Sequence, residues 1–355
     1  MKGLSRKFSM ALALGVGACD GGSTVLSTER PQPPVDSLAP PIDTGTAAPA
    51  PPPDSGAPPP LPPDSAPPPL PPDSAPPPVG PPVHTGIPFG PTVETKHASS
   101  MSLLPPSSFS PAFTVLLDAA YVPTLLARLE AARRTNGRVL LTFTGNEKYN
   151  RDSGGFSLSI WKQRVDRFRG IDLSSYIADG TLMGHFILDE PSDPTNWNGH
   201  LVSLADIEEM ARYSKEIWPD LPAIIRAWPA YLKGYQYKYL DAAWAQYHTR
   251  FGSIDDFIAN NVRDAKASGL ALVLGLNVVA GGGEDGIPGY YRDKHAMTAS
   301  QVRTWGGALM AQPYICAFFL YTYNPEYFAL PDIQAAMAEL SATAQSLPNQ
   351  PCRRQ

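Results

Sequence analysis

The feature that most constrains the fold is a regular alternation of short apolar runs and longer amphipathic segments over the last 250 or so residues. The apolar runs are bounded by Gly, Pro, Asp or Asn and have the length of strands: 139–144, 184–189, 223–227, 240–247, 271–278 and 315–321. A further first strand is expected at 99–104 or at 113–117. The amphipathic segments have the period of helices: 122–135, 157–169, 204–218, 254–268, 298–312 and 331–347.

Strands that alternate with helices at this rhythm favour parallel pairing through helical crossovers. Six or seven strands in about 250 residues fit a (β/α)8 TIM-type barrel with one or two strands disguised, better than an open doubly wound sheet. No G-x-G-x-x-G follows the first strand, which weakens the dinucleotide-binding alternative. We therefore predict an α/β protein whose residues 95–355 form one (β/α)8-type barrel domain.

The run 184–189 ends on two adjacent carboxylates, Asp189 and Glu190, and Pro191 then stops the strand because proline has no N–H to donate. In parallel α/β sheets, the loops after the carboxyl ends of the strands build the ligand site. The motif Leu-Asp-Glu-Pro, residues 188–191, also occurs in the Walker B strand of transport ATPases. No G-x-x-x-x-G-K-[ST] motif is present in this sequence to hold nucleotide phosphates, so an ATPase is not indicated. These two carboxylates therefore indicate an active-site rim.

Polar and aromatic residues follow the other predicted strands at the same edge. Those expected to bind substrate are Arg226, Trp228, Trp244, Gln246, Tyr247, Asn277, Tyr321 and Tyr323, with Trp244 and Trp228 as the main stacking platforms. Sugars offer C–H faces to aromatic rings and hydroxyls to amides and carboxylates, so this mixture suits a carbohydrate ligand. The domain resembles barrel glycoside hydrolases, in which a glutamate ends a central strand and an aromatic residue often ends the last one.

Glu190 is the predicted general acid, because burial at an apolar strand end can raise the pKa of a carboxyl group. The resemblance implies a second glutamate at the end of a late strand. In this sequence the late strands 271–278 and 315–321 have Asn277 and Tyr321 at that position instead. The remaining candidates for that role are Glu284, in a glycine-rich loop, and Glu326. Asp189 is the fourth acid of the predicted catalytic set, although an orienting role toward a loop or an arginine suits it better.

Two other functions stay open on the sequence alone. A barrel that lacks a complete acid pair would be a noncatalytic glycan-binding or scaffold protein. A barrel that acts on a small molecule other than a sugar also fits, since the fold does not name the chemistry. Arg226 either clamps a carboxylate on an acidic sugar or forms a structural ion pair with Asp189.

The N-terminus resembles a bacterial lipoprotein signal, residues 1–18. Lys2, Arg6 and Lys7 form a basic region, residues 8–16 are apolar but too short to span a bilayer, and small residues precede Cys19. The resemblance implies that Cys19 is acylated and anchors the mature chain in the bacterial cell envelope. The alternative is an ordinary signal peptide that contains a cysteine. Either reading exports the chain, and the choice between inner and outer membrane stays open.

Residues 19–94 are expected to form a disordered, proline-rich spacer. From about Pro31 to Pro91 the chain is rich in Pro, Ser, Asp and Ala, and a nine-residue repeat begins at Ala57 and again at Ala66. Such a segment buries too little apolar surface to offset its ordering entropy and favours extended polyproline II. Its P-x-x-P motifs could also dock a proline-binding module.

Composition excludes several other classes. After removal of the signal, 25 Lys and Arg stand against 33 Asp and Glu, and no basic stripe is present to bind nucleic acid. The histidines show no paired ligand spacing, so neither a metal nor a cofactor is expected. Cys316 lies in an apolar run and Cys352 in the polar tail, which favours a buried free thiol and a frayed tail thiol over a disulfide. We expect a monomer.

Overall fold

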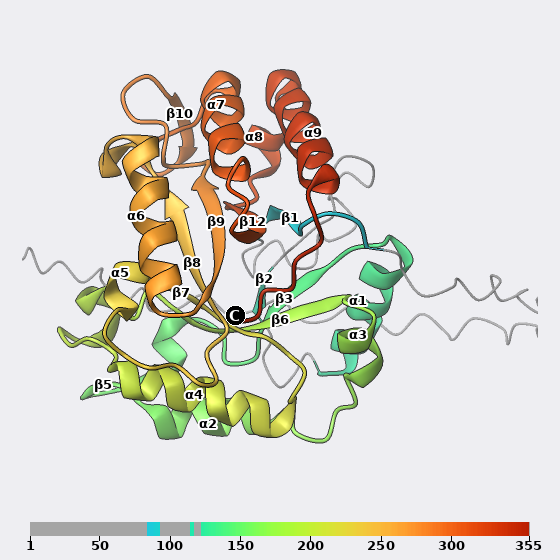
Figure 1. Cartoon of the computed structure of the whole chain (residues 1–355), viewed down its shortest axis with the longest axis vertical. Helices are drawn as coiled ribbons and strands as arrows, with labels where there is room; N and C mark the ends of the chain where they lie inside the picture. Colours follow the sequence, from blue (N-terminus) through green and yellow to red (C-terminus); the bar gives the residue numbers. More distant parts are fainter. Residues whose placement is uncertain (1–83, 93–113, 117–121, 355) are drawn as a thin grey trace, which may run out of the picture. The chain divides into compact units, whose positions relative to one another are not determined.

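The structure is a computed structural model that describes residues 84–92, 114–116 and 122–354. The chain divides into two units, residues 1–72 and 73–355, and every described residue belongs to the second. In this part the chain forms a (β/α)8 TIM-type barrel whose parallel strands follow the order β1-β12-β9-β8-β7-β6-β3-β2 (Figure 1). The strands are β1 (Phe89–Pro91), β2 (Thr114–Leu116), β3 (Val139–Thr142), β6 (Leu182–Asp189), β7 (Ala223–Arg226), β8 (Ala242–Tyr247), β9 (Ala271–Asn277) and β12 (Ile315–Tyr321).

Helices follow most of these strands and pack along them. Figure 1 shows α6 beside β8 and α7 beside β9, and α4 packs on β6 and β7. The longer helices are α1 (Val122–Arg134), α2 (Leu158–Asp166), α4 (Leu204–Ile217), α6 (Ile254–Ala267), α7 (Ala299–Met310) and α9 (Pro331–Ser346). Shorter ones are α3 (Ser174–Ala178), α5 (Pro229–Leu232), α8 (Pro325–Phe328) and the 3-10 turns η3 (Glu147–Tyr149), η4 (Pro194–Trp197) and η5 (Thr249–Phe251). Two hairpins complete the described part: β4 (Arg151–Asp152) with β5 (Gly155–Phe156), and β10 (Ile287–Tyr291) with β11 (Lys294–Ala296).

Side-chain caps fix the starts of the long helices. The hydroxyl of Ser203 accepts a hydrogen bond from the amide of Asp206 at 3.0 Å, and Ser253 accepts from the amides of Asp255 and Asp256. Thr298 and Gln301 form a reciprocal capping box at α7. These contacts satisfy backbone N–H groups that have no partner inside the helix. The helices predicted from periodicity therefore begin at, or one residue from, the positions that the sequence gives them.

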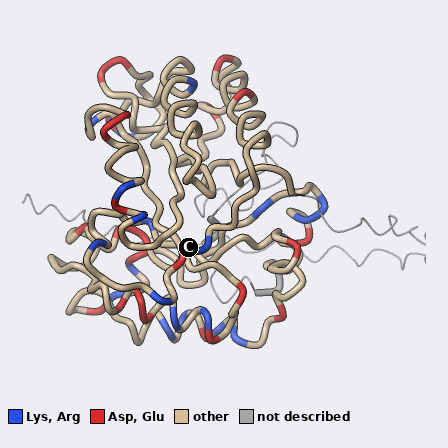
Figure 2. The backbone as a smooth tube through the Cα atoms, in the orientation of Figure 1, with Lys and Arg blue, Asp and Glu red and all other residues tan. Residues whose placement is uncertain are grey.

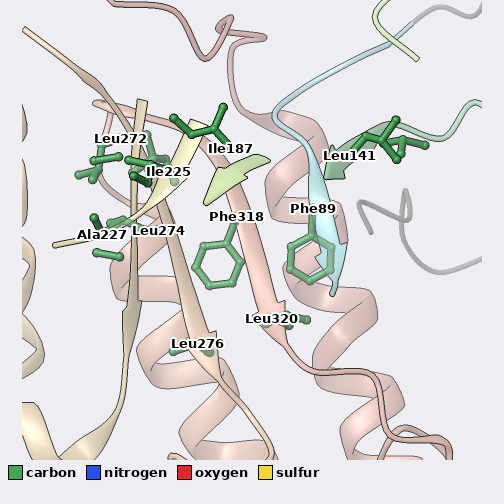
Figure 3. Packing of buried hydrophobic residues seen from close by; sticks show 14 of the residues in the cluster. Phe89, Leu141, Ile187, Ile225, Ala227, Leu272, Leu274, Leu276, Phe318 and Leu320 are labelled. Carbon is green, nitrogen blue, oxygen red and sulfur yellow. The ribbon is translucent and has the colours of Figure 1, made fainter. Parts of the chain in front are cut away.

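The sheet separates two apolar layers, because successive side chains of a strand point to opposite faces. The larger layer lies between the sheet and the helices and contains Ile225, Leu274 and Phe318 (Figure 3). The smaller layer fills the barrel interior with Leu140, Phe186, Ile224, Ala242, Trp244, Val273, Ala317 and Phe319. On β8, residues 242 and 244 belong to the interior layer, whereas 243, 245 and 247 belong to the outer one. This alternation decides which strand residues can reach a ligand in the barrel mouth.

The six predicted strands and six predicted helices are confirmed within a few residues at each end. Of the two alternatives for an early strand, 113–117 contains β2, and 99–104 lies outside the described residues. The signal, Cys19 and most of the spacer also lie outside them. β1, at 89–91, falls in the predicted spacer, yet it pairs with β12, and Phe89 stacks on Phe318 with ring centroids 5.9 Å apart. The folded part thus begins before residue 95, because apolar Ile87 and Phe89 interrupt the proline-rich composition.

The expectation of two free thiols is wrong: Cys316 and Cys352 form a disulfide across 36 residues of sequence. Both cysteines are buried in the interior layer. The polar composition of the tail was misleading because the tail returns beneath the amino ends of the strands. There, Asn349 accepts a hydrogen bond from Arg138 at 3.2 Å, and the amide of Arg354 reaches Asp241 at 3.4 Å. Contacts distant in sequence hold the cysteine in place.

Basic and acidic residues both occur along the outer helices (Figure 2). Glu209 of α4 pairs with Lys162 of α2 at 2.5 Å and with Arg212 at 2.6 Å, and Arg212 also reaches Glu216 at 2.5 Å. Exposed pairs of this kind stabilise a fold by about 1 kcal/mol or less each. Within the described residues, no helix has the length and apolarity needed to cross a membrane.

Candidate functional site

A cleft of about 280 Å³ opens at the carboxyl ends of the strands. It is lined by Glu190 and Ser192 after β6, by Arg226 and Trp228 at the end of β7, and by residues at the ends of β8 and β9 that include Trp244, Gln246, His248 and Asn277. A larger cavity of about 580 Å³ lies at the opposite end of the strands, between α3 and the end of α4. The smaller cleft is the better candidate, because it contains the converging charged groups that a barrel active site requires.

Arg226 is the centre of this cleft. Its Nε donates to an oxygen of Asp189, its Nη2 lies 3.0 Å from Oε1 of Glu190, and its Nη1 donates to Oε1 of Gln246 at 3.1 Å. The guanidinium also lies over the ring of Tyr321, 5.9 Å from the centroid. Burial alone would lower the pKa of Arg226, but the two carboxylates outweigh burial and raise it. The predicted ion pair with Asp189 is present, and Glu190 belongs to it as well.

Glu190 is held by its backbone as well as by its side chain. Its φ of 41° lies in the left-handed region, which non-glycine residues adopt rarely. Its amide donates to the carbonyl of Arg226 at 3.0 Å, and its carbonyl accepts from the indole N–H of Trp197 at 2.9 Å. Trp197 itself is fully buried. An unfavourable backbone conformation fixed by surrounding contacts is typical of functional sites.

Glu147 is a further carboxyl group of the site, one that the strand pattern did not indicate. It opens η3, directly after β3, and its side chain makes a hydrogen bond with that of Asp189. Burial, followed by the charge of Asp189, raises the pKa of Glu147 to about 7, although Arg226 acts in the opposite direction. The sequence signal for it is the run Thr144-Gly145-Asn146 after β3. Asn146 caps the turn η3, and this turn places Glu147 near the carboxyl ends of the strands.

Four of the predicted binding residues line the cleft with polar or partly exposed groups: Arg226, Trp228, Gln246 and Asn277. Trp228 packs edge-on against Phe251, with ring centroids 4.7 Å apart, and remains partly exposed. Asn277 already accepts a hydrogen bond from the amide of Ala280 at 3.1 Å through its side-chain oxygen. Trp228 is therefore the aromatic residue of the cleft that best suits stacking.

Trp244 does not suit the stacking role predicted for it. It points into the barrel, where Phe186 and Phe319 pack against it at centroid distances of 5.4 and 5.2 Å, and it is 2% exposed. Trp244 lines the cleft only from the barrel interior. Its indole N–H and the side-chain N–H₂ of Gln246 are buried without a hydrogen-bond partner among the described residues. These two donors lie at the floor of the cleft.

The remaining predicted site residues are placed elsewhere. Tyr247 and Tyr323 are buried in the layer between sheet and helices, and the hydroxyl of Tyr247 donates to the carbonyl of Gly252 at 2.8 Å. Glu284 and Glu326 are exposed, and neither lines the cleft. Tyr321 does lie at the centre, since its ring faces Arg226 and its hydroxyl is 3.2 Å from that of Tyr291. The acids brought together are thus Glu190, Asp189 and Glu147.

Comparison with solved structures supports the fold. The chain is similar to a cellulase solved in complex with an inhibitor, with a TM-score of 0.52 and 10% identity over 74% of this chain and 93% of that one. It is also similar to a β-glucanase from Saccharophagus degradans (TM-score 0.49, 10% identity, 74% and 89% covered) and to an endocellulase from Pyrococcus horikoshii with cellotetraose (0.48, 11%, 74% and 93%). No family model and no curated protein matches the chain. At these identities the likeness establishes the architecture, and the first of the three carries it: a (β/α)8 barrel of the kind found in glycoside hydrolases.

Proposed function

We propose that this protein binds a glycan in the cleft at the carboxyl ends of its strands and hydrolyses a glycosidic bond there. The observation that carries the proposal is the gathering of Glu190 and Asp189 on the guanidinium of Arg226, with Glu147 hydrogen-bonded to Asp189. Glycoside hydrolysis commonly uses two carboxyl groups, one to give a proton and one to attack or to activate water. A rim with several carboxyl groups in different surroundings provides that combination.

Glu190 lines the cleft, and we propose that it acts at the anomeric carbon of the substrate. The sequence predicts it as the proton donor. Its contact with Arg226 favours another role, because a guanidinium has only donors and the Glu190 oxygen facing it must accept. We therefore assign Glu190 the part of the acceptor, which attacks the anomeric carbon or takes a proton from water.

The other cleft residues suit a sugar ligand. Trp228 provides a partly exposed ring for a C–H face, and Gln246 and Asn277 place amide groups beside it. The unpartnered donors of Trp244 and Gln246 favour a ligand rich in oxygen acceptors, since buried donors are stabilised when they are paired. A hydroxyl-bearing glycan meets each of these conditions.

The test is a hydrolysis screen of the full-length chain on polysaccharides and oligosaccharides, run beside Glu190→Gln. Hydrolysis of at least one glycan by the wild type, reduced by about 10²–10⁴-fold in Glu190→Gln, supports the proposal. The matched control is Glu284→Gln, because that exposed carboxylate lies outside the cleft and its loss should leave the rate unchanged. Thermal melts establish that all three proteins are folded.

Glycan binding by a wild-type protein that hydrolyses nothing would overturn the hydrolase proposal and favour the noncatalytic glycan-binding barrel. Equal loss of activity in Glu190→Gln and Glu284→Gln would show that the effect does not come from the cleft. Neither binding nor hydrolysis across the screen would contradict a glycan function altogether and leave a small-molecule substrate of another class.

We further propose that the barrel is exported and held at the bacterial cell envelope by a lipid on Cys19. The basic and apolar segments before Cys19 support this location. The Cys316–Cys352 disulfide supports export, because disulfides persist mainly in oxidising compartments. Metabolic labelling with a fatty acid tests the anchor: the wild type should carry label and sediment with membranes, and Cys19→Ser should lose both. Unlabelled wild-type protein would contradict the anchor and leave a cleaved signal peptide.

A further inference from the structure

We propose that Glu147 supplies the proton for this reaction and that Asp189 holds and orients it through their shared hydrogen bond. The inference rests on the proposed hydrolase function and names the residue that the sequence left unassigned. It departs from the predicted assignment, in which Glu190 is the acid and Glu284 or Glu326 its partner.

The position of Glu147 is fixed by its loop. The side chain of Asn146 accepts from the amide of Lys148 at 3.2 Å, and the amide of Asn150 donates to the carbonyl of Glu147 at 2.9 Å. The side chain of Asn150 reaches back to the hydroxyl of Thr144 at 3.3 Å. These contacts fix the backbone of the short 3-10 turn at both of its ends, and from it the Glu147 side chain reaches Asp189 at the end of β6.

Asp189 connects this carboxyl group to the centre of the cleft. One oxygen of Asp189 accepts a hydrogen bond from Nε of Arg226, and the Asp189 carboxyl group is also hydrogen-bonded to that of Glu147. Two carboxyl groups in such contact are stable when they share one proton, since two negative charges at this distance repel each other. Because Asp189 is already an acceptor for Arg226, the proton belongs on Glu147.

The surroundings of Glu147 keep it protonated. Burial and the negative charge of Asp189 act together to raise its pKa to about 7, and Arg226 of β7 is the cation that opposes them. The turn η4 packs against η3 and contributes no ionisable side chain of its own, while Asp193 at its start is engaged by the amide and hydroxyl of Thr195. A carboxylic acid that keeps its proton near neutral pH is suited to general acid catalysis.

The step balances with water as the co-substrate. Glu147 gives its proton to the glycosidic oxygen, and the bond between that oxygen and the anomeric carbon breaks with its electron pair going to the oxygen. Glu190 attacks the anomeric carbon or takes a proton from water at that carbon. If Glu190 has attacked, water then bonds to the same carbon, the ester bond to Glu190 breaks with its electron pair returning to the carboxylate, and a proton of that water goes to Glu147. If Glu190 has instead taken a proton from water, the water oxygen bonds to the carbon, Glu190 releases that proton to solvent, and Glu147 regains one from solvent. Either route consumes one water molecule.

The experiment compares the wild type with Glu147→Gln on two substrates of the same sugar: the polysaccharide hydrolysed in the screen and its 2,4-dinitrophenyl glycoside. A glutamine keeps an N–H donor for Asp189 and so preserves the turn. We expect hydrolysis of the polysaccharide to fall by about 10²–10⁴-fold. The dinitrophenyl glycoside should lose far less, because its leaving group departs without a proton. The alkaline limb of the wild-type pH–rate profile, near pH 7, should vanish in the variant.

A merely structural role predicts something else. It would lower the rates on both substrates alike, or lower the melting temperature, and it would leave the alkaline limb in place. Either result overturns the inference. Full polysaccharide activity in Glu147→Gln would overturn it as well. Lys148→Gln is the matched control, because this exposed neighbour on the same turn changes charge without entering the pair.

Infrared pH-difference spectra separate this inference from the proposed function. The wild type should show the C=O band of a protonated carboxyl group that disappears as the pH rises through about 7, and Glu147→Gln should lack it. If the band is present and the wild type hydrolyses no glycan, the hydrolase proposal fails although the protonated pair exists. If the wild type hydrolyses glycans and the band is missing, the hydrolase proposal stands and the assignment of Glu147 fails.

Discussion

Both ends of the barrel contain buried charged groups, but the two ends differ in how their carboxyl groups are paired with cations. At the amino end, Asp241 is 3% exposed, accepts a hydrogen bond from the amide of Ala223 at 2.8 Å and pairs with Lys215 at 2.5 Å. At the carboxyl end, Glu147, Asp189 and Glu190 gather around the single guanidinium of Arg226. At the amino end one acid is paired with one cation, whereas at the carboxyl end three carboxyl groups gather around one guanidinium.

This difference indicates how the barrel divides its tasks. A charge that is paired and hydrogen-bonded from every side contributes to a stable fold and has nothing left to offer a ligand. Three carboxyl groups around one guanidinium, together with the unpartnered donors of Trp244 and Gln246, are unfavourable for stability and become favourable when a substrate binds. The carboxyl end therefore carries the chemistry, and the amino end, where the Cys316–Cys352 disulfide also lies, holds the fold together.

Removing the acid at the amino end should give the largest change in stability. Asp241→Ala removes the carboxylate that neutralises the ammonium of Lys215 and accepts from the amide of Ala223, which should lower the free energy of unfolding by about 3–5 kcal/mol. Urea unfolding measures this loss. Below the unfolding transition, glycan hydrolysis should be unchanged. A folded variant with wild-type stability and lost activity would reverse the division proposed for the two ends.

Breaking the disulfide should have the next largest effect. Cys352→Ser opens a loop of 36 residues, and the gain in chain entropy of the unfolded state should lower the free energy of unfolding by about 4 kcal/mol. The wild type under reducing conditions should approach the variant, and denaturant titrations of both provide the comparison. An unchanged midpoint would show that the tail is held mainly by contacts such as Arg138 with Asn349.

The smallest effect concerns pH and the carboxyl end. The pKa of Glu147 is about 7 in the folded protein, above its ordinary value of 4.5, so the folded state binds the extra proton between these two values. Stability from this group is complete below pH 4.5 and is lost as the pH rises through 7. After allowance for solvent screening, the loss should be about 1–2 kcal/mol. Glu147→Gln should remove this slope from unfolding curves measured at pH 5 and pH 8, and a slope that persists would assign it to another group.

The sequence predicted the architecture well because the architecture depends on local patterns. The period of the apolar residues, the caps at Ser203 and Ser253, and the proline after Glu190 each act over a few residues. β1 was missed because three residues within a proline-rich stretch carry little pattern, and only β12 makes them a strand. The disulfide was missed for the same reason, since the tail becomes part of the barrel interior only after folding.

The candidate site was predicted in part. Arg226, Gln246, Trp228 and Asn277 line the cleft because strand ends converge in any parallel barrel. Trp244 and Tyr247 illustrate what this argument lacks: both lie on the same strand, yet one points into the barrel and the other toward the helices. Glu147 was missed because it lies on a turn, beyond the strand whose end was identified. Its importance comes from Asp189, which is 42 positions away in the sequence.

The most direct test of this account measures glycan hydrolysis and the free energy of unfolding on the same two variants, Glu190→Gln and Cys352→Ser, beside the wild type. The account predicts that Glu190→Gln loses about 10²–10⁴-fold in hydrolysis with little change in stability, and that Cys352→Ser loses stability while its folded fraction hydrolyses at the wild-type rate. Hydrolysis that survives in Glu190→Gln would contradict the central claim that the carboxyl groups around Arg226 carry the chemistry.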